Sequence, residues 1–188
     1  MFDKKVIAIG SDHAGFRLKS KLIEYFRNAG RNDIEIIDCG CSSKEPTDYP
    51  MYAGAVCNSI QTGEAMFGIL ICGTGVGMCM AANKYQGIRA VLSNDAGIVK
   101  LAREHNNANV LCLAGRIQPS EHQLFELIKT FLSTEFTFAG RHVRRISQME
   151  DSMVKVTTLA AAGTPASDED DEPPAMDQVS KVAQALED

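Results

Sequence analysis

The sequence predicts an α/β protein of three layers, in which helices cover both faces of a five-stranded parallel sheet in a doubly wound, Rossmann-like arrangement. A disordered acidic C-terminal tail is expected to follow. Short apolar segments alternate with helical patterns between residues 6 and 132, and this alternation favours a parallel sheet with helices on both faces. A glycine-rich turn directly follows the third apolar segment, and such folds bind ligands beyond the ends of their strands.

Each expected strand is a short apolar run bounded by polar residues or glycine. These runs are residues 6–10, 34–39, 68–71, 88–93 and 109–113. Amphipathic patterns predict the helices. They cover residue 16 to about residue 28, and residues 52–61, 78–83, 95–104, 121–132 and 140–154. In the helix at residues 95–104, the pattern predicts that Ile98, Leu101 and Ala102 face the core. In the helix at residues 121–132, it predicts one apolar face formed by Leu124, Leu127, Ile128 and Phe131.

The composition changes near residue 157, which divides the chain into an expected domain at residues 1–156 and a tail at residues 157–188. From residue 164 onward the tail holds eight acidic residues and one lysine. Residues 165–174 are acidic and contain prolines without apolar periodicity, so disorder is expected there, and residues 176–186 could form a marginal helix. The chain carries a net charge of −5, of which residues 164–188 supply −7, so the first 163 residues carry +2. Their basic residues are scattered apart from a cluster at residues 141–145, which argues against a nucleic-acid surface.

No apolar run is long enough to span a bilayer, and the N-terminus leads directly into the first strand, so neither a membrane span nor a signal peptide is expected. The six cysteines form no Cys-x-x-Cys pair and lie mostly among apolar residues: Cys39, Cys41, Cys57, Cys72, Cys79 and Cys112. This pattern indicates reduced thiols in a cytoplasmic protein, and it disfavours a thiol-redox function.

The turn after the third strand is the centre of the functional prediction. It reads Cys72, Gly73, Thr74, Gly75, Val76, Gly77. Glycines allow backbone N–H groups to point outward, where they join the dipole of the next helix to bind an anion. A cysteine beside such a turn is expected to have a lowered pKa and to act as a thiolate base or nucleophile. The alternative is a small buried side chain beside glycines that serve packing alone. The spacing differs from the Gly-x-Gly-x-x-Gly dinucleotide fingerprint, so NAD is not expected.

Two further segments carry residues suited to chemistry. Asp12 and His13 follow the first strand, where Asp12 could cap the next helix and His13 could bind an anion. His105 and Asn106 are expected between a helix and the fifth strand. There His105 could act as a general acid–base group, or could merely complement the helix dipole.

Arginines complete the set of candidates. Arg116 follows the fifth strand, and Arg141 and Arg145 are four residues apart on one helix, so they share a face. Because a guanidinium group fits phosphate oxygens bidentately, arginines near a glycine-rich turn predict a phosphorylated small molecule as the ligand. Arg144 is expected on the solvated face, and His142 can be read either way.

Eight short motifs occur in order along the chain. They are Ser11-Asp-His-Ala-Gly15, Thr47-Asp-Tyr-Pro50, Ile71-Cys-Gly-Thr-Gly-Val-Gly77, Ala81-Ala-Asn-Lys84, Gly87-Ile-Arg-Ala90, Arg103-Glu-His-Asn106, Asn109-Val110 and Gly140-Arg-His142. Together they resemble type B ribose-5-phosphate isomerase, in the wider family that includes galactose-6-phosphate isomerase subunits. The resemblance covers about residues 5–149. Cysteine at position 72 resembles the branch that uses this residue as base, whereas other members place a glutamate near Met78 and Cys79.

The resemblance implies interconversion of D-ribose 5-phosphate and D-ribulose 5-phosphate through an enediolate, without a metal or an organic cofactor. Cys72 would be the base, and the N–H groups of the turn at residues 73–77 would stabilise the enediolate. His105, with Thr74, would open the furanose ring. The remaining implied roles are sugar-hydroxyl binding by Asp12 and Asn106, pocket lining by Tyr49, and phosphate binding by His13, Arg116, Arg141 and Arg145.

The resemblance also implies a homodimer, or a tetramer of paired dimers, with each site built from two subunits. His105, Asn106 and Arg116 of one chain would then meet Cys72 of another. Two alternatives stay open. One is the same chemistry on a hexose 6-phosphate, such as galactose 6-phosphate or allose 6-phosphate; the other is a non-catalytic sugar-phosphate-binding module that would not need Cys72.

Overall fold

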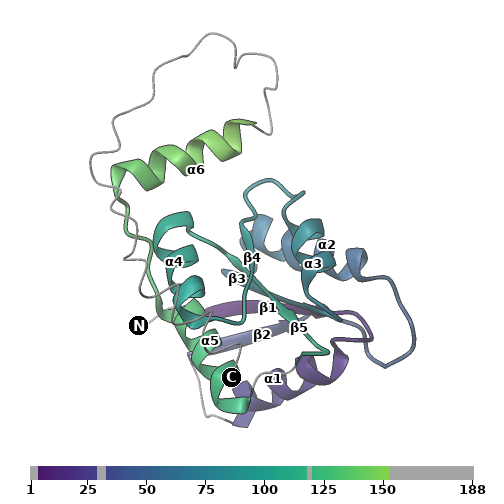
Figure 1. Cartoon of the computed structure of the whole chain (residues 1–188). Helices are drawn as coiled ribbons and strands as arrows, with labels where there is room; N and C mark the ends of the chain where they lie inside the picture. The colour runs from purple at the N-terminus through teal and green to yellow at the C-terminus, as the bar shows by residue number, and fades with distance from the viewer. Residues whose placement is uncertain (1–3, 29–32, 118–119, 153–188) are drawn as a thin grey trace, which may run out of the picture. The chain divides into compact units, whose positions relative to one another are not determined.

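The computed structural model describes residues 4–28, 33–117 and 120–152 of the 188-residue chain. The strands among them are β1 (Lys5–Ser11), β2 (Ile34–Asp38), β3 (Phe67–Cys72), β4 (Ala90–Leu92) and β5 (Val110–Ala114). The helices are α1 (Phe16–Asn28), α2 (Tyr49–Gln61), α3 (Val76–Ala82), α4 (Ala96–Asn106), α5 (Glu121–Ser133) and α6 (Gly140–Ser152). Both the alternation of strands and helices and the number of strands confirm the prediction (Figure 1).

The five strands form one parallel sheet in the order β2-β1-β3-β5-β4. The chain leaves β1 toward the edge strand β2 and then returns to build β3 on the other side of β1. The winding therefore reverses between β1 and β3, the point at which doubly wound sheets place their ligands. All strands end at the same edge of the sheet, called the carboxyl edge here, and begin at the opposite amino edge.

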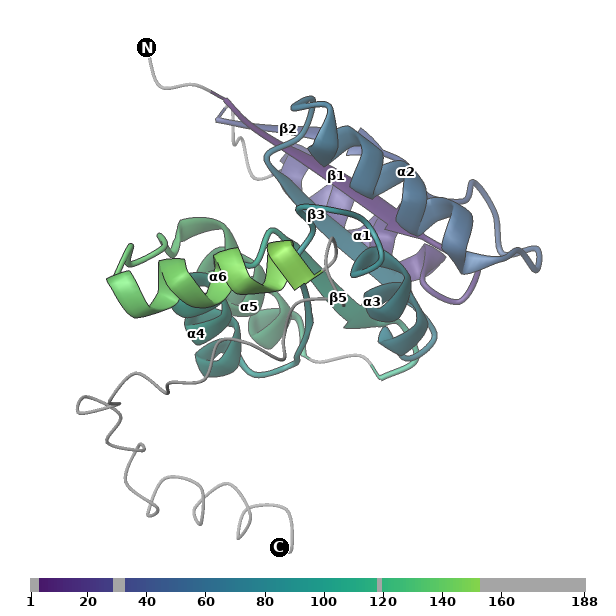
Figure 2. The same ribbon diagram turned by 90° about the horizontal axis from the view of Figure 1, so that it is seen from above.

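Helices cover both faces of this sheet. On one face, α1, α4 and α5 pack over an apolar cluster that includes Ile69 and Ile71 of β3. On the other face, α2 and α3 pack over a second cluster that includes Leu70 and Cys72 (Figure 2). Alternate residues of a strand point to opposite faces, which is why one apolar run supplies both clusters. The predicted three-layer fold is confirmed.

Several boundaries differ from the prediction. Helix α2 begins at Tyr49 rather than at residue 52, because Pro50 occupies its first turn, where no N–H group is needed. Helix α3 begins at Val76, so Gly77 is helical. Strand β4 is limited to three residues. Helix α4 extends to Asn106 and ends at Asn107, which adopts the left-handed conformation with φ of 48°.

The predicted inward face of α4 is wrong at two positions. Ile98 and Leu101 are 51% and 43% exposed, and the buried side chains are those of Val99, Ala102 and Arg103. The sequence of α4 carries apolar residues on more than one face, so periodicity alone does not set its rotation. In α5, by contrast, the predicted face of Leu124, Leu127, Ile128 and Phe131 is buried.

The domain boundary near residue 157, the expected disorder of the tail and its marginal helix lie outside the described residues. Among the helices that the structure describes, none has the length and apolar character needed to cross a membrane.

Candidate active site

Three strand ends meet at the carboxyl edge of the sheet. The Asp12 N–H donates to Ile71 O at 3.2 Å, the Gly115 N–H donates to Cys72 O at 2.7 Å, and the Arg116 N–H donates to Gly73 O at 3.1 Å. These bonds continue the sheet pairing beyond β1, β3 and β5. They bring the segments that follow these strands together, as the switch-point argument predicts.

Cys72 is the last residue of β3, and its side chain lies on the α2 and α3 face with 5% exposure. The Gly75 N–H donates to Cys72 Sγ at 3.2 Å. Gly75 caps the start of α3 with φ of 78°, and a Cβ there would lie 2.5 Å from Leu92 Cδ1. Glycine is thus required at the position that holds the sulfur.

The rest of the turn lies beside Tyr49. A Cβ on Gly77 would lie 2.7 Å from Tyr49 Cζ, so the tyrosine ring covers the backbone at the start of α3. Tyr49 remains 38% exposed. The Val76 N–H donates to Thr74 Oγ1 at 3.4 Å, and the Val76 side chain is exposed. Tyr49 therefore lies between the glycine turn and solvent.

Asp12 and His13 are both engaged within the protein. The Gly15 N–H donates to Asp12 Oδ1 at 2.9 Å, and Asp12 is 6% exposed, so its carboxylate holds the turn before α1. His13 Nδ1 lies 3.1 Å from the Thr47 N–H, which donates to it, and 3.2 Å from Thr47 O. Thr47 Oγ1 lies 3.1 Å from the Tyr52 hydroxyl. The loop before α2 thus orients the His13 ring.

Arg116 differs from the expectation that it reaches Cys72 from a second chain. A Cβ on Gly73 would lie 3.3 Å from Arg116 Nε of the same chain. Because β5 pairs with β3, the residue after β5 falls beside the turn after β3. The guanidinium group therefore lies beside the glycine turn without help from a partner.

His105 and Asn106 lie at the opposite edge of the sheet. They form the last turn of α4, which precedes the start of β5, whereas Cys72 pairs with Ala114 at the end of β5. The five residues of β5 separate the two edges by about 13 Å at 3.3 Å per residue. One chain does not bring His105 and Asn106 to Cys72.

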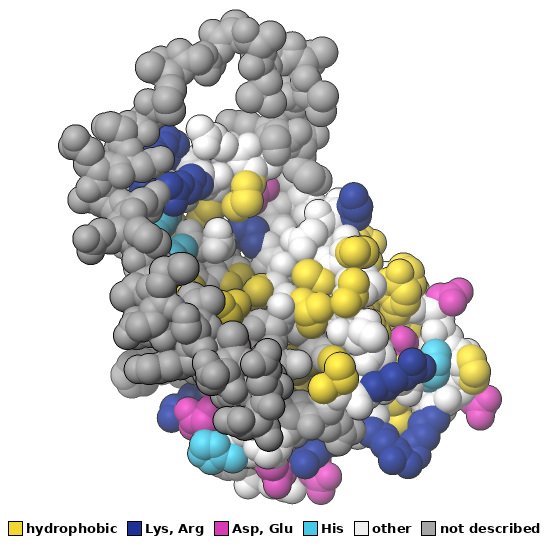
Figure 3. Space-filling model, in the orientation of Figure 1, with side chains coloured by type: hydrophobic (Ala, Val, Ile, Leu, Met, Phe, Trp, Pro, Cys, Tyr) yellow, Lys and Arg dark blue, Asp and Glu magenta, His cyan; other side chains and the backbone are white. Residues whose placement is uncertain are grey.

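Helix α6 carries the remaining candidates. Arg141, Arg144 and Arg145 are exposed on it, and Figure 3 shows basic side chains gathered over this helix. His142 is 4% exposed, its ring centroid lies 4.3 Å from that of His105, and its Nδ1 lies 2.9 Å from Thr137 Oγ1. His142, which the sequence left undecided, is thus a packing partner of His105.

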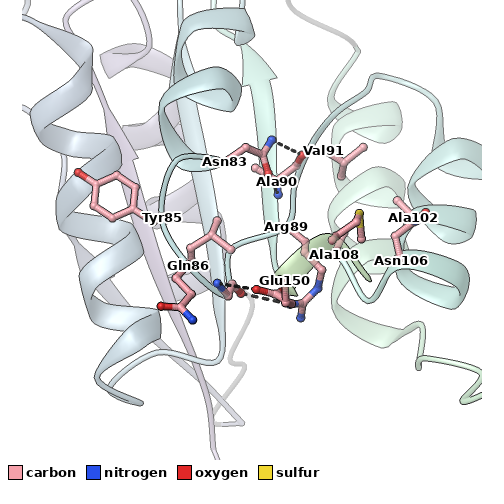
Figure 4. Close-up of a pocket in the computed structure, with 13 residues that line it drawn as sticks. Asn83, Tyr85, Gln86, Arg89, Ala90, Val91, Ala102, Asn106, Ala108 and Glu150 are labelled. Atoms are coloured by element: carbon pink, nitrogen blue, oxygen red, sulfur yellow. Dashed lines mark hydrogen bonds and ion pairs between the residues drawn. The ribbon is translucent and has the colours of Figure 1, made fainter. Parts of the chain in front are cut away.

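Sequence reasoning did not anticipate the network around Arg89. Arg89 Nη1 lies 2.9 Å from Glu150 Oε1 of α6, and Arg89 Nε donates to Asn107 O at 3.0 Å. Arg89 and Glu150, with Asn83 and Asn106, line a cavity of about 350 Å³ at the amino edge (Figure 4). The sequence signal for this network is Arg89 itself, in the motif at residues 87–90. Its partner Glu150 lies 61 positions later in the chain, and no local sequence pattern predicts such a pair.

The cysteines are all free thiols. A hydrogen bond from the Cys112 thiol, supported by the Asn83 amide, lowers the pKa of Cys79 to about 7 against the effect of burial. Burial raises the pKa of Cys57 to about 12. Within the described part of the chain, no three His, Cys, Asp or Glu side chains gather in a way that could hold a metal ion.

Comparisons with known proteins agree with this geometry. Residues 7–149 match the family described as Ribose/Galactose Isomerase. The chain is 42% identical over 142 residues to ribose-5-phosphate isomerase B of Escherichia coli, covering 76% of this chain and 92% of that protein. It is 42% identical over 144 residues to a probable ribose-5-phosphate isomerase B of Mycoplasma pneumoniae, covering 76% and 91%.

Two solved structures are similar as well. A ribose 5-phosphate isomerase of Thermotoga maritima superposes with a TM-score of 0.73 at 49% identity, covering 78% of this chain and 98% of that one. Type B ribose 5-phosphate isomerase of Trypanosoma brucei superposes with a TM-score of 0.74 at 42% identity, covering 79% and 99%.

The sheet order, the reversal between β1 and β3, and the thiol beside a glycine turn define a doubly wound α/β protein with a glycine-rich strand-to-helix turn at its carboxyl edge. The comparisons with known proteins then identify the family within this class of fold. The chain belongs to the ribose/galactose isomerase family, among the type B ribose-5-phosphate isomerases. The resemblance seen in the sequence motifs is confirmed.

Proposed function

We propose that this protein interconverts D-ribose 5-phosphate and D-ribulose 5-phosphate without a cofactor, in the non-oxidative pentose phosphate pathway. The observation that carries the proposal is the contact between Cys72 and the glycine turn, where the Gly75 N–H donates to Sγ at 3.2 Å. This contact orients a thiol at the point where the winding of the sheet reverses. The similar proteins of known name are ribose-5-phosphate isomerases. Cytoplasmic action is part of the proposal, supported by the free thiols.

In the proposed reaction, the Cys72 thiolate removes the proton from the carbon next to the carbonyl of the open-chain sugar. The electrons of that C–H bond form the enediolate, and the thiol then returns the proton to the neighbouring carbon. A proton moves between the two oxygens, so substrate and product are isomers and nothing else is consumed. Backbone N–H groups at residues 73–77 would stabilise the enediolate, since fixed donors stabilise developing negative charge.

Substrate binding is assigned to residues at the same edge of the sheet. Asp12 lies beside the turn, close to the end of β3, and Tyr49 covers Gly77. Arg116 lies against Gly73, so it can reach an anion bound by the turn. His13, oriented by Thr47, is the remaining phosphate ligand that the chain carrying Cys72 would supply.

The other assigned residues require a second chain. His105 and Asn106 lie at the amino edge, and Arg141 and Arg145 lie on α6, which packs beside α4. We therefore propose a homodimer, or a tetramer of dimers, in which His105 of one chain opens the sugar ring beside Cys72 of the other, with Thr74 assisting. Exposed apolar side chains on α3 (Val76 and Met80) and α4 (Ile98 and Leu101) suit burial in such an interface.

The experiment that tests this function compares the native protein with Cys72→Ala. A coupled assay should show turnover of ribose 5-phosphate, and turnover should collapse in Cys72→Ala while calorimetry still detects ribose 5-phosphate binding. Cys39→Ala is the control, because Cys39 is a half-buried thiol at the end of β2 with no assigned role.

Turnover that survives in Cys72→Ala would remove this residue from the mechanism. If neither protein turns over the sugar yet both bind it, the chain is a sugar-phosphate-binding module. The same assay with galactose 6-phosphate and allose 6-phosphate tests the hexose alternative, and a strong hexose preference would replace the pentose assignment.

A further inference from the structure

The end of α4 and helix α6 both carry residues assigned to the substrate, and Arg89 contacts both. Arg89 follows the turn after α3, at the amino edge. Its Nε donates to Asn107 O at 3.0 Å, directly after His105 and Asn106. Its Nη1 lies 2.9 Å from Glu150 Oε1, on the helix of Arg141 and Arg145. Figure 4 shows Arg89 and Glu150 pointing toward one another.

The surroundings hold Arg89 in place. The backbone N–H of Arg89 donates to Asn109 Oδ1 at 2.8 Å, and the Arg89 side-chain atom Nη1 also lies 3.3 Å from Gly87 O. Its side chain is 20% exposed and that of Glu150 is 32% exposed. The pair is therefore partly shielded from water, where charged hydrogen bonds are stronger than on an open surface.

Glu150 uses both of its carboxylate oxygens. While Oε1 binds Arg89, Oε2 accepts from the Gly87 N–H at 3.2 Å. The start of α6 is held separately, because Thr137 Oγ1 donates to Glu104 O at 2.9 Å and lies 2.9 Å from His142 Nδ1. Helix α6 is thus held by hydrogen bonds near both of its ends. Glu150 makes the contacts at the C-terminal end, after Arg141 and Arg145.

We propose that Arg89 is a positioning residue of the active site, which fixes the end of α4 and helix α6 relative to one another through Asn107 and Glu150. This inference rests on the proposed isomerase function, because it assigns Arg89 no contact with the substrate. Its consequence is that His105, Asn106, Arg141 and Arg145 reach a partner chain's substrate as one rigid set.

The test weakens one contact at a time. Glu150→Gln keeps the shape of the side chain but removes its charge, so it loosens α6 and leaves the bond from Arg89 to Asn107. We expect KM for ribose 5-phosphate to rise about tenfold, as losing one charged hydrogen bond implies, with kcat nearly unchanged. The inhibition constant of inorganic phosphate should rise in parallel. Arg89→Gln loosens the end of α4 as well, so kcat should fall too.

Glu126→Gln is the matched control, because Glu126 pairs with Lys129 at 3.6 Å on the exposed side of α5. Unchanged KM and phosphate inhibition in Glu150→Gln, with at most a lower Tm, would overturn the inference and leave the pair as packing. If Glu150→Gln does not fold, Glu150→Asp gives the same readout, because the shorter side chain keeps its charge but moves it away from Arg89.

Failure of the proposed function is distinguishable from failure of this inference. Native protein that does not isomerise ribose 5-phosphate contradicts the function alone. The inference is then decided by calorimetry with inorganic phosphate: weaker binding to Glu150→Gln than to native protein and Glu126→Gln supports it, and equal binding overturns it.

Discussion

At the scale of single residues, the carboxyl edge of the sheet depends on glycines, because a side chain at these positions would collide with a neighbouring backbone. A Cβ on Gly15 would lie 2.4 Å from Ile71 O, and one on Gly115 would lie 2.7 Å from Ala14 O. The backbones that follow β1, β3 and β5 therefore touch directly. The turn that holds Cys72 rests on this contact, so small changes at these glycines are expected to affect the site as well as stability.

Gly75→Ala tests this coupling. A non-glycine residue at φ of 78° costs about 1–2 kcal/mol, and the added Cβ would also collide with Leu92 Cδ1 at 2.5 Å. We expect a loss of about 2–4 kcal/mol in urea unfolding and a lower kcat. Gly63→Ala is the control, because Gly63 has a similar φ of 76° but a Cβ added there would meet no other group within 4 Å. A lower kcat in both variants, or equal losses of stability, would contradict the prediction.

Cys79 should be the most reactive half-buried thiol. Its pKa of about 7, lowered mainly by the hydrogen bond from Cys112, makes it largely thiolate above neutral pH. Iodoacetamide labelling followed by mass spectrometry should therefore rise through about pH 7 and level off above it. Cys57, whose pKa burial raises to about 12, should stay unlabelled over the same range. Equal labelling of both thiols, or labelling of Cys79 that begins only near pH 9, would contradict the lowered pKa.

At the scale of elements, periodicity predicted which segments are helical better than how they are rotated. Helix α5 presents one apolar face, and that face is buried. Helix α4 carries exposed Ile98 and Leu101 beside buried Val99 and Ala102, so its burial is decided by tertiary packing, which no local pattern contains. The predicted start of α2 at residue 52 is wrong because proline fits the first turn of a helix, so the helix already begins at Tyr49.

Helix α6 supplies the prediction at this scale. Arg141→Ala removes the guanidinium group that we propose as a bidentate phosphate ligand, so KM for ribose 5-phosphate should rise at least about tenfold in steady-state assays. Arg144→Ala is the control, because Arg144 is exposed on the same helix without an assigned role. A change in Tm alone for Arg141→Ala would assign this arginine to packing or to a subunit interface.

At the scale of the whole molecule, the sequence predicted which segments meet at the carboxyl edge of the sheet better than where the other candidate residues lie. Cys72, Gly75 and Asp12 meet at the switch point, as the order of strands and turns indicated. Arg116 was assigned to a partner chain but lies beside Gly73 of its own. The Arg89–Glu150 pair joins residues far apart in the chain, and only the folded backbone places them together.

Complementation tests the proposed sharing of sites. Cys72→Ala and His105→Ala should each be inactive alone. When the two are unfolded together and refolded, half of the dimers would contain one of each chain and one intact site, which gives about a quarter of native activity. Mixing Cys72→Ala with Cys72→Ser is the control and should restore none. No recovery in the first mixture, with mixed dimers shown by native mass spectrometry, would place each site within a single chain.

The separation of His105 from Cys72 across the sheet also bears on how turnover depends on dilution. In the proposed mechanism, a single chain would hold the base Cys72 without a ring-opening His105 beside it, so an isolated monomer would be inactive. Specific activity would then decline once the protein is diluted below the dissociation constant of the dimer, and it would recover on concentration with second-order kinetics.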